Sequence, residues 1–176
     1  MAVMQKIREI LSPEEFDSPK LEPPVGKTKY RIIPLDQKNL EEVIKLNLRC
    51  FSNGENYTEA TFKHLLTAPN ILGYRIITTE EQMVGFIFVG VSNETIGHIT
   101  TIGIAPEHRK RGLAKKLLEH AEKALRRRNY DSAVLEVRVG NYIAQNLYHR
   151  LGYTIIQKIN RYYTDGEDAY LMAKAL

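Results

Sequence analysis

Residues 109–114 read Arg-Lys-Arg-Gly-Leu-Ala and lie between a β-prone run that ends at Ile104 and a helical pattern that continues to about Arg128. A helix N-terminus presents unpaired backbone N–H groups and about half a positive charge, which suits a bound phosphate. Gly112 has no side chain, so a phosphate can approach the backbone closely, and the small Ala114 keeps the next turn open. Because several donors follow one another, the stretch predicts a site for a pyrophosphate rather than for a lone phosphate.

The pattern at residues 109–114 is a weak signal when it stands alone. With average residue frequencies it occurs by chance in roughly one chain in six of this length. It lacks the Gly-Lys-Ser/Thr of a Walker loop and the GxGxxG turn of dinucleotide-binding folds. The rest of the chain therefore has to decide between a phosphate site and an ordinary basic helix start.

The flanking residues predict an α/β layered fold with a mixed sheet. Runs rich in Ile, Val and Phe indicate strands, and apolar residues at helical spacing indicate helices. The expected strands span residues 30–35, 74–79, 83–91, 95–104, 132–139, 153–162 and 169–173, and the expected helices lie between Asp36 and Ser52 and over residues 58–66, 112–128 and 142–151. Short connections among the second to fourth strands indicate an antiparallel meander, and the next helix indicates a βαβ crossover.

The first 28 residues differ from the rest of the chain. Four of the seven prolines fall there, and Pro23-Pro24 followed by Val25-Gly26 cannot continue a helix. Met4, Ile7 and Leu11 have the spacing of one short amphipathic helix. We therefore expect a proline-rich extension over residues 1–28 and one folded domain over residues 29–176.

The overall composition is that of an ordinary globular protein. Of the 176 residues, 43% are hydrophobic and 26% are charged, which excludes a disordered or fibrous chain. The single cysteine cannot form an internal disulfide, and the sequence has neither an apolar run of about 18 residues nor a secretory signal. We expect a cytoplasmic protein with no membrane partner.

Positive charge is concentrated around the helix of residues 112–128. The formal net charge is +4, but residues 106–129 alone carry nine basic and three acidic side chains. Arg126, Arg127 and Arg128 are expected to complement the negative end of this helix, with a ribosome or RNA contact as the alternative.

Five motifs in the second half of the chain resemble the GNAT superfamily of acetyl-CoA-dependent N-acetyltransferases. Four of them are His98-Ile99-Thr100-Thr101-Ile102-Gly103-Ile104-Ala105-Pro106, Arg109–Ala114, Leu135-Glu136-Val137-Arg138-Val139-Gly140-Asn141 and Asn146-Leu147-Tyr148-His149-Arg150-Leu151-Gly152-Tyr153. The fifth, residues 162–172, resembles the catalytic subunits that acetylate protein N-termini and the ribosomal-protein-alanine acetyltransferases. The resemblance covers about residues 29–176 and does not extend to residues 1–28.

This resemblance implies a fold and an acetyl donor. The fold is a mixed, mostly antiparallel seven-stranded sheet flanked by four helices, and the donor is acetyl-CoA. Backbone groups of Ile102, Gly103 and Ile104 would hold the pantetheine arm and polarise the thioester. The pyrophosphate would be bound by Arg109, Lys110, Arg111, Gly112, Leu113 and Ala114. Asn141 would contact the cofactor where the fifth strand ends, and Tyr148 would lie beside its sulfur.

Glu136 and Tyr148 are the expected catalytic pair. An α-amino group has a pKa of about 7.7–8.0, so a modest base acting through water is enough to deprotonate it. In the similar alanine acetyltransferases the glutamate of Leu-Glu-Val-Arg is the general base, and a tyrosine twelve residues on is the general acid. Glu136 and Tyr148 have this spacing. The alternatives are a surface glutamate paired with Arg138 and a tyrosine that packs against the sheet.

The resemblance also implies residues on the substrate side. His98 occupies a position where some N-terminal acetyltransferases hold the deprotonating water. Glu55 resembles a residue that contributes to catalysis or selects the first residue, and Tyr57 would line the peptide pocket. Tyr162 and Tyr163 would hold the first peptide unit from the opposite side. For each of these residues, ordinary surface polarity or packing is the alternative.

Cys50 is expected to be a buried spectator, because no His partner is near it in the sequence. The histidines are scattered, so no metal site is expected. The sequence favours acetylation of protein or peptide N-termini by direct attack in a ternary complex. Acetylation of a lysine side chain or small amine, and a non-catalytic acetyl-CoA-binding module, are the competing interpretations. The oligomeric state and the accepted first residue stay open at this stage.

Overall fold

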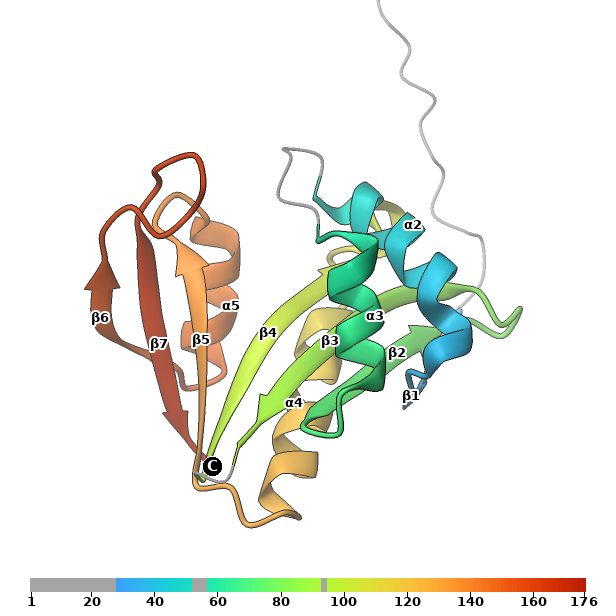
Figure 1. The fold of residues 1–176 in the computed structure, drawn as a ribbon, viewed down its shortest axis with the longest axis horizontal. Helices are drawn as coiled ribbons and strands as arrows, with labels where there is room; N and C mark the ends of the chain where they lie inside the picture. The colour runs from blue at the N-terminus through green and yellow to red at the C-terminus, as the bar shows by residue number, and fades with distance from the viewer. Residues whose placement is uncertain (1–27, 52–56, 93–94) are drawn as a thin grey trace, which may run out of the picture.

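The computed structural model describes residues 28–51, 57–92 and 95–176. They form one seven-stranded sheet in the order β1-β2-β3-β4-β5-β7-β6 with helices on both faces (Figure 1). The strands are β1 (Arg31–Pro34), β2 (Ile71–Ile77), β3 (Met83–Val91), β4 (Ile96–Ile104), β5 (Ser132–Arg138), β6 (Thr154–Ile159) and β7 (Ala169–Ala175). The α-helices are α2 (Leu40–Cys50), α3 (Glu59–Thr67), α4 (Leu113–Arg126) and α5 (Tyr142–Arg150), and 3-10 turns span Gln37–Asn39 and Pro106–His108.

The expected sheet and its four helices are confirmed. The predicted helix around Met4 and the predicted helix stop at residues 52–54 lie outside the described residues. Asp36 does cap a helical start, but its capping box closes the 3-10 turn that precedes α2. Thr58 caps α3 through its side chain, as predicted.

Two strand boundaries were wrong. β2 begins at Ile71 instead of residue 74, because Ile71 pairs with Gly90 of β3. β6 ends at Ile159 instead of residue 162, because Arg161 has a positive φ of 50° and turns the chain. Residues 160–168 therefore form a loop, and both Tyr162 and Tyr163 lie in it.

The sheet opens between β4 and β5. These two strands are parallel and pair only from Ile96 to His98, whereas all other neighbouring strands are antiparallel. Beyond His98 they diverge, as Figure 1 shows. A register shift against β3 makes Thr100 a bulge in β4 at this point, and such bulges bend a strand. From Ile99 onward, one edge of β4 is therefore not covered by β5.

Helices cover the two faces of the sheet and place the core between them. α4 packs against β2, β3 and β4 through an apolar stripe, while α2 and α3 pack against the same strands from the other side (Figure 1). The buried residues of that stripe are Leu113, Leu117, Leu118, Ala121 and Leu125. Within the described ranges, none of the helices has the length and apolar character that crossing a membrane demands.

Candidate active site

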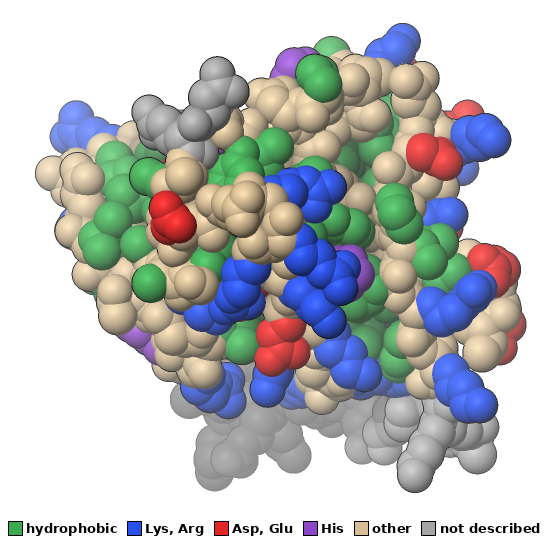
Figure 2. Space-filling model, turned by 90° about the horizontal axis from the view of Figure 1, so that it is seen from below, with side chains coloured by type: hydrophobic (Ala, Val, Ile, Leu, Met, Phe, Trp, Pro, Cys, Tyr) green, Lys and Arg blue, Asp and Glu red, His purple; other side chains and the backbone are tan. Residues whose placement is uncertain are grey.

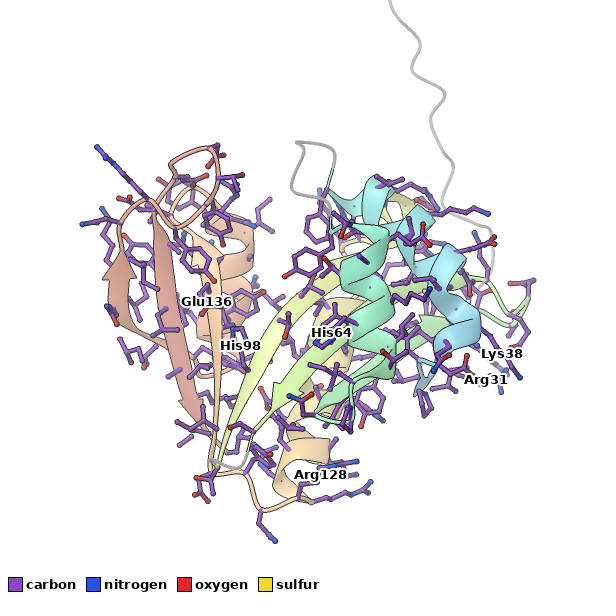
Figure 3. The ribbon with its side chains drawn as sticks, in the orientation of Figure 1. Arg31, Lys38, His64, His98, Arg128 and Glu136 are labelled. Carbon is purple, nitrogen blue, oxygen red and sulfur yellow. The ribbon has the colours of Figure 1, made fainter. Side chains whose placement is uncertain are left out.

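His98 and Glu136 face each other at the point where β4 and β5 separate. His98 is the last β4 residue that pairs with β5, and its Nε2 lies 2.7 Å from Oε2 of Glu136 (Figure 3). Burial alternates along β5, so Glu136 and Arg138 share one face, as predicted. The Arg138 guanidinium extends to the carboxylates of Asp165 and Glu167, whereas Glu136 bonds to His98. This geometry disfavours a simple Glu136–Arg138 surface pair.

Glu136 changes the titration of His98. The hydrogen bond from Glu136 raises the pKa of His98, burial lowers it, and the charge of Glu136 raises it further. The side chains are 42% and 19% exposed for His98 and Glu136, so both are reachable from solvent. Within the part of the chain that the structure describes, Oε1 of Glu136 has no hydrogen-bond partner, which leaves one carboxylate oxygen for an incoming proton.

The charge of Glu136 acts on three tyrosines named from the sequence. Burial raises the pKa of Tyr57, Tyr162 and Tyr163, and the negative charge of Glu136 raises all three further. The Tyr57 hydroxyl donates to the carbonyl of the bulged Thr100 at 3.2 Å. The Tyr162 and Tyr163 rings meet edge to face with centroids 5.1 Å apart. The fold thus brings phenols from two distant loops to one carboxylate.

Tyr148 lies on α5 and is buried, with 7% of its surface exposed. Burial raises its pKa to about 12, so the phenol is protonated at neutral pH. Its ring packs edge to face on Tyr153 at 5.9 Å. Burial raises the pKa of Tyr163 above its ordinary value, and the charges of Glu136 and of ionised Tyr148 raise it further.

The segment before α4 has the backbone of an anion site. Gly112 caps the helix in the left-handed region with φ 75°, and Lys110 is left-handed as well, with φ 58°. Successive turns of this kind point backbone N–H groups into a concavity that suits anions. A Cβ placed on Gly112 would meet nothing within 4 Å, so the space before the helix is open. These residues fit the diphosphate of a coenzyme.

The arginines of this segment bond to the protein. Arg109 donates from Nε to the Ile104 carbonyl at 3.1 Å and from Nη2 to the Cys50 carbonyl at 3.0 Å. Arg111 donates to the Tyr30 hydroxyl at 3.0 Å and to the Glu107 carbonyl at 3.1 Å. These bonds brace the segment before α4, and pyrophosphate binding by residues 109–114 stays a prediction. Sequence reasoning missed Tyr30, because the contact spans 81 residues and no local pattern marks it.

The other predicted cofactor residues are placed as follows. Ile102 lies half-buried on the part of β4 that β5 does not cover, and Gly103 and Ile104 are buried beside it. Leu113 is also buried, so only its backbone can face a ligand. Asn141 caps α5 by accepting from the Ala144 N–H at 3.1 Å. Glu55 lies outside the described residues.

Cys50 ends α2 and lies closer to β4 than its sequence position indicates. A Cβ built on Gly103 would be 3.1 Å from the Cys50 Sγ. Burial raises the pKa of the Cys50 thiol to about 11. Since the thiolate is the nucleophilic form, this environment supports the prediction of a spectator.

Basic side chains gather where α4 ends. Figure 2 shows Lys and Arg side chains over the face seen from below. Figure 3 labels Arg128, which lies at the end of α4. Arg128 donates to the Ala124 carbonyl at 3.1 Å, which is the helix-end role expected of it. No cluster of three metal-ligating side chains occurs among residues 28–51, 57–92 and 95–176.

A mixed sheet that divides between two parallel strands, with a helix N-terminus open to an anion, is the fold that the resemblance to GNAT acetyltransferases implied. The family model "Acetyltransferase (GNAT) family" matches residues 40–153, and the chain belongs to this family. It is an acyltransferase whose acetyl donor is acetyl-CoA.

Known relatives and solved structures agree with this assignment. The chain is 39% identical to the catalytic subunit of the N-terminal acetyltransferase A complex of Arabidopsis thaliana, over 74% of this chain and 69% of that protein. It is 32% identical to an N-alpha-acetyltransferase of Sulfurisphaera tokodaii, over 84% and 93% of the two chains. The crystal structure of the ribosomal-protein-S18-alanine N-acetyltransferase of Escherichia coli matches with a TM-score of 0.76 and 28% identity, over 84% and 94% of the two chains.

Proposed function

We propose that this protein acetylates the N-terminal α-amino group of protein or peptide substrates. The observation that carries the proposal is the hydrogen-bonded His98–Glu136 pair, whose negative charge raises the pKa of Tyr57, Tyr162 and Tyr163. Phenol hydroxyls can bond to peptide backbone, and a partly exposed carboxylate can take a proton from an amine. The printed names of the relatives describe action on protein N-termini, which supports the same substrate class.

The donor would be held by backbone groups of the diverging strand and of the helix start. Ile102, Gly103 and Ile104 supply the strand edge, residues 109–114 supply the anion cradle, and Asn141 lies at the start of α5. When bound there, the coenzyme supplies an activated thioester. Arg109 and Arg111 contribute by fixing the loop, because their guanidinium groups are bonded to protein atoms.

In the proposed mechanism the amine attacks directly in a ternary complex. Glu136 Oε1 accepts a proton from the amine through a water, and His98 holds Oε2 so that the other oxygen faces the substrate. Tyr148 Oη would hold the proton that the departing thiolate takes up, and its pKa of about 12 keeps this phenol protonated at neutral pH. The high pKa of Cys50 favours this mechanism over one with an acetyl-cysteine.

Replacing Tyr148 by Phe is expected to slow turnover while peptide affinity is retained. The ring and its packing on Tyr153 stay, and only the acidic hydrogen is lost, so kcat should fall by about 10²-fold or more. Steady-state kinetics with a fixed peptide measures this. Tyr74→Phe is the matched control, because Tyr74 packs on His120 of α4. A loss of peptide affinity at unchanged kcat would make Tyr148 a binding residue instead.

The substrate class is tested by incubating the protein with acetyl-CoA and a peptide library varied at position one. Mass spectrometry then locates each acetyl group. We expect acetylation at the α-amine, with Ala, Ser, Thr and Gly preferred, because Glu55-Asn56-Tyr57 resembles the motif of enzymes for small first residues. Acetylation at internal lysines or of small amines would overturn the proposal, and binding without turnover would indicate a non-catalytic module.

We further infer a cytoplasmic protein in which residues 1–28 form an extension and residues 29–176 the catalytic domain. The lone cysteine, which cannot form an internal disulfide, supports this location. The basic residues at the end of α4 support an association with ribosomes, where N-termini emerge.

A further inference from the structure

One arginine anchors the loop of residues 160–168 to β5. Nη1 of Arg138 donates to the Asp165 carboxylate at 2.9 Å and also to the carboxylate of Glu167. The same guanidinium lies over the Tyr163 ring, 3.9 Å from its centroid. Only 20% of the Arg138 side chain is exposed, so these charge-assisted contacts are partly shielded from water.

Glu167 extends this anchor to the start of α5. Its Oε2 accepts from Arg138, while its Oε1 accepts from the backbone N–H of Gly140 at 2.8 Å. A Cβ on Gly140 would lie 2.9 Å from that Oε1, so a glycine is what permits this approach. Gly140 directly precedes Asn141, the N-cap of α5. One carboxylate thus ties the loop to the end of β5 and to the turn before α5.

Burial alone does not fix this loop. Most residues from 160 to 166 are exposed, including Tyr162, which is 46% exposed. Arg161 and Gly166 both have positive φ values, so the chain turns at these two residues. Those turns are closed by backbone bonds from Tyr163 to Glu167 and from Gly166 to Tyr163. The position of the Tyr162 and Tyr163 rings therefore depends largely on the polar contacts of Arg138 and Glu167.

We propose that Arg138 and Glu167 form a clamp that positions Tyr162 and Tyr163 over the site and thereby sets the affinity for the peptide. This inference rests on the proposed action on peptide N-termini. Arg138 is a positioning residue, because it acts through Tyr163 and the loop. Its loss should raise the peptide KM by about tenfold, change kcat less, and leave coenzyme A affinity unchanged.

The experiment uses the full chain with Arg138→Gln, Glu167→Gln and the double variant. If the two residues form one clamp, the double variant raises the peptide KM no more than either single variant. Arg138→Lys should not rescue, since a lysine cannot bridge two carboxylates and stack on a ring at once. Lys158→Gln is the matched control, because it breaks the Lys158–Asp168 ion pair of the same hairpin at 2.8 Å.

Several outcomes overturn the clamp. They are an unchanged peptide KM in Arg138→Gln and Glu167→Gln, an equal rise in the Lys158→Gln control, and additive effects in the double variant. Calorimetry with coenzyme A separates a loop effect from general damage, because a damaged fold would lose this affinity as well.

Hydrogen exchange separates failure of the clamp from failure of the proposed function. If the wild-type protein acetylates no peptide N-terminus, the proposed function fails but the anchor can still be measured. The Tyr163 and Gly166 amides should then exchange faster in Arg138→Gln than in Lys158→Gln. Equal exchange in the two variants would show that Arg138 does not hold the loop.

Discussion

Replacing Glu136 by Gln is expected to lower kcat by about 10²- to 10⁴-fold, the usual cost of losing a general base. Glutamine keeps the size of the side chain and can still bond to His98, so packing at the end of β5 should be preserved. What is lost is the carboxylate oxygen that takes a proton from the amine. Steady-state rates with a saturating peptide, together with coenzyme A affinity by calorimetry, check this result.

The matched control is Glu119→Gln, which removes an exposed carboxylate from α4 that pairs only loosely with Lys115 at 3.7 Å. It should leave kcat unaltered. If Glu136→Gln turns over as fast as this control, Glu136 is an ordinary strand glutamate and the base must be another group.

The same substitution should change the titration of His98 in a known direction. In the native protein the bond and the charge of Glu136 raise the pKa of His98, while burial lowers it. Glu136→Gln removes the charge that raises this pKa, while the burial that lowers it stays. The pKa of His98 should therefore fall below its ordinary value of 6.5. NMR titration of the imidazole measures this. Because the native pKa is raised, the pair stabilises the fold fully below pH 6.5, and this contribution fades as pH rises through the folded-state pKa.

The sequence predicted most of the fold because its elements are marked locally. Apolar spacing located α4, and alternation located β5 with Glu136 on its half-buried face. The two wrong boundaries, at Ile71 and Ile159, depend on cross-strand pairing and on the left-handed Arg161, which leave no periodic signal. The divergence of β4 and β5 after His98 is likewise a property of the pairing, which no local pattern marks.

The site was predicted less completely, because its contacts join distant parts of the chain. His98, Glu136 and the tyrosines were named from motifs, but the motifs did not show what these residues contact. The hydrogen bond of His98 with Glu136 spans 38 residues, and that of Tyr57 with Thr100 spans 43. The basic run at residues 109–111 predicted a pyrophosphate site but did not predict which protein groups its side chains contact. In the structure, Arg109 and Arg111 bond to Cys50, Ile104, Glu107 and Tyr30. The composition of this segment gives its net charge but not the direction in which each charged side chain extends.

Replacing Gly112 by Glu is expected to abolish coenzyme A binding. No heavy atom lies within 4 Å of a Cβ built on Gly112, so a glutamate side chain there would enter open space. It would bring a negative charge to the helix start that is expected to hold a diphosphate. It would also force a non-glycine residue to φ 75°, which costs about 1–2 kcal/mol of stability. Titration calorimetry with coenzyme A, without any peptide, measures the loss independently of turnover.

Two further variants separate these effects. Gly166→Glu imposes a similar strain, at φ 85° with open space around it, but in the loop between β6 and β7, so coenzyme A affinity should survive. Gly112→Ala keeps the strain at the helix start and adds no charge, so its affinity should lie between those of the native protein and Gly112→Glu. If Gly112→Glu binds coenzyme A as tightly as Gly166→Glu, the diphosphate lies elsewhere. The anion site at α4 would then be only a helix start with a glycine cap, and the bracing by Arg109 and Arg111 would serve stability alone.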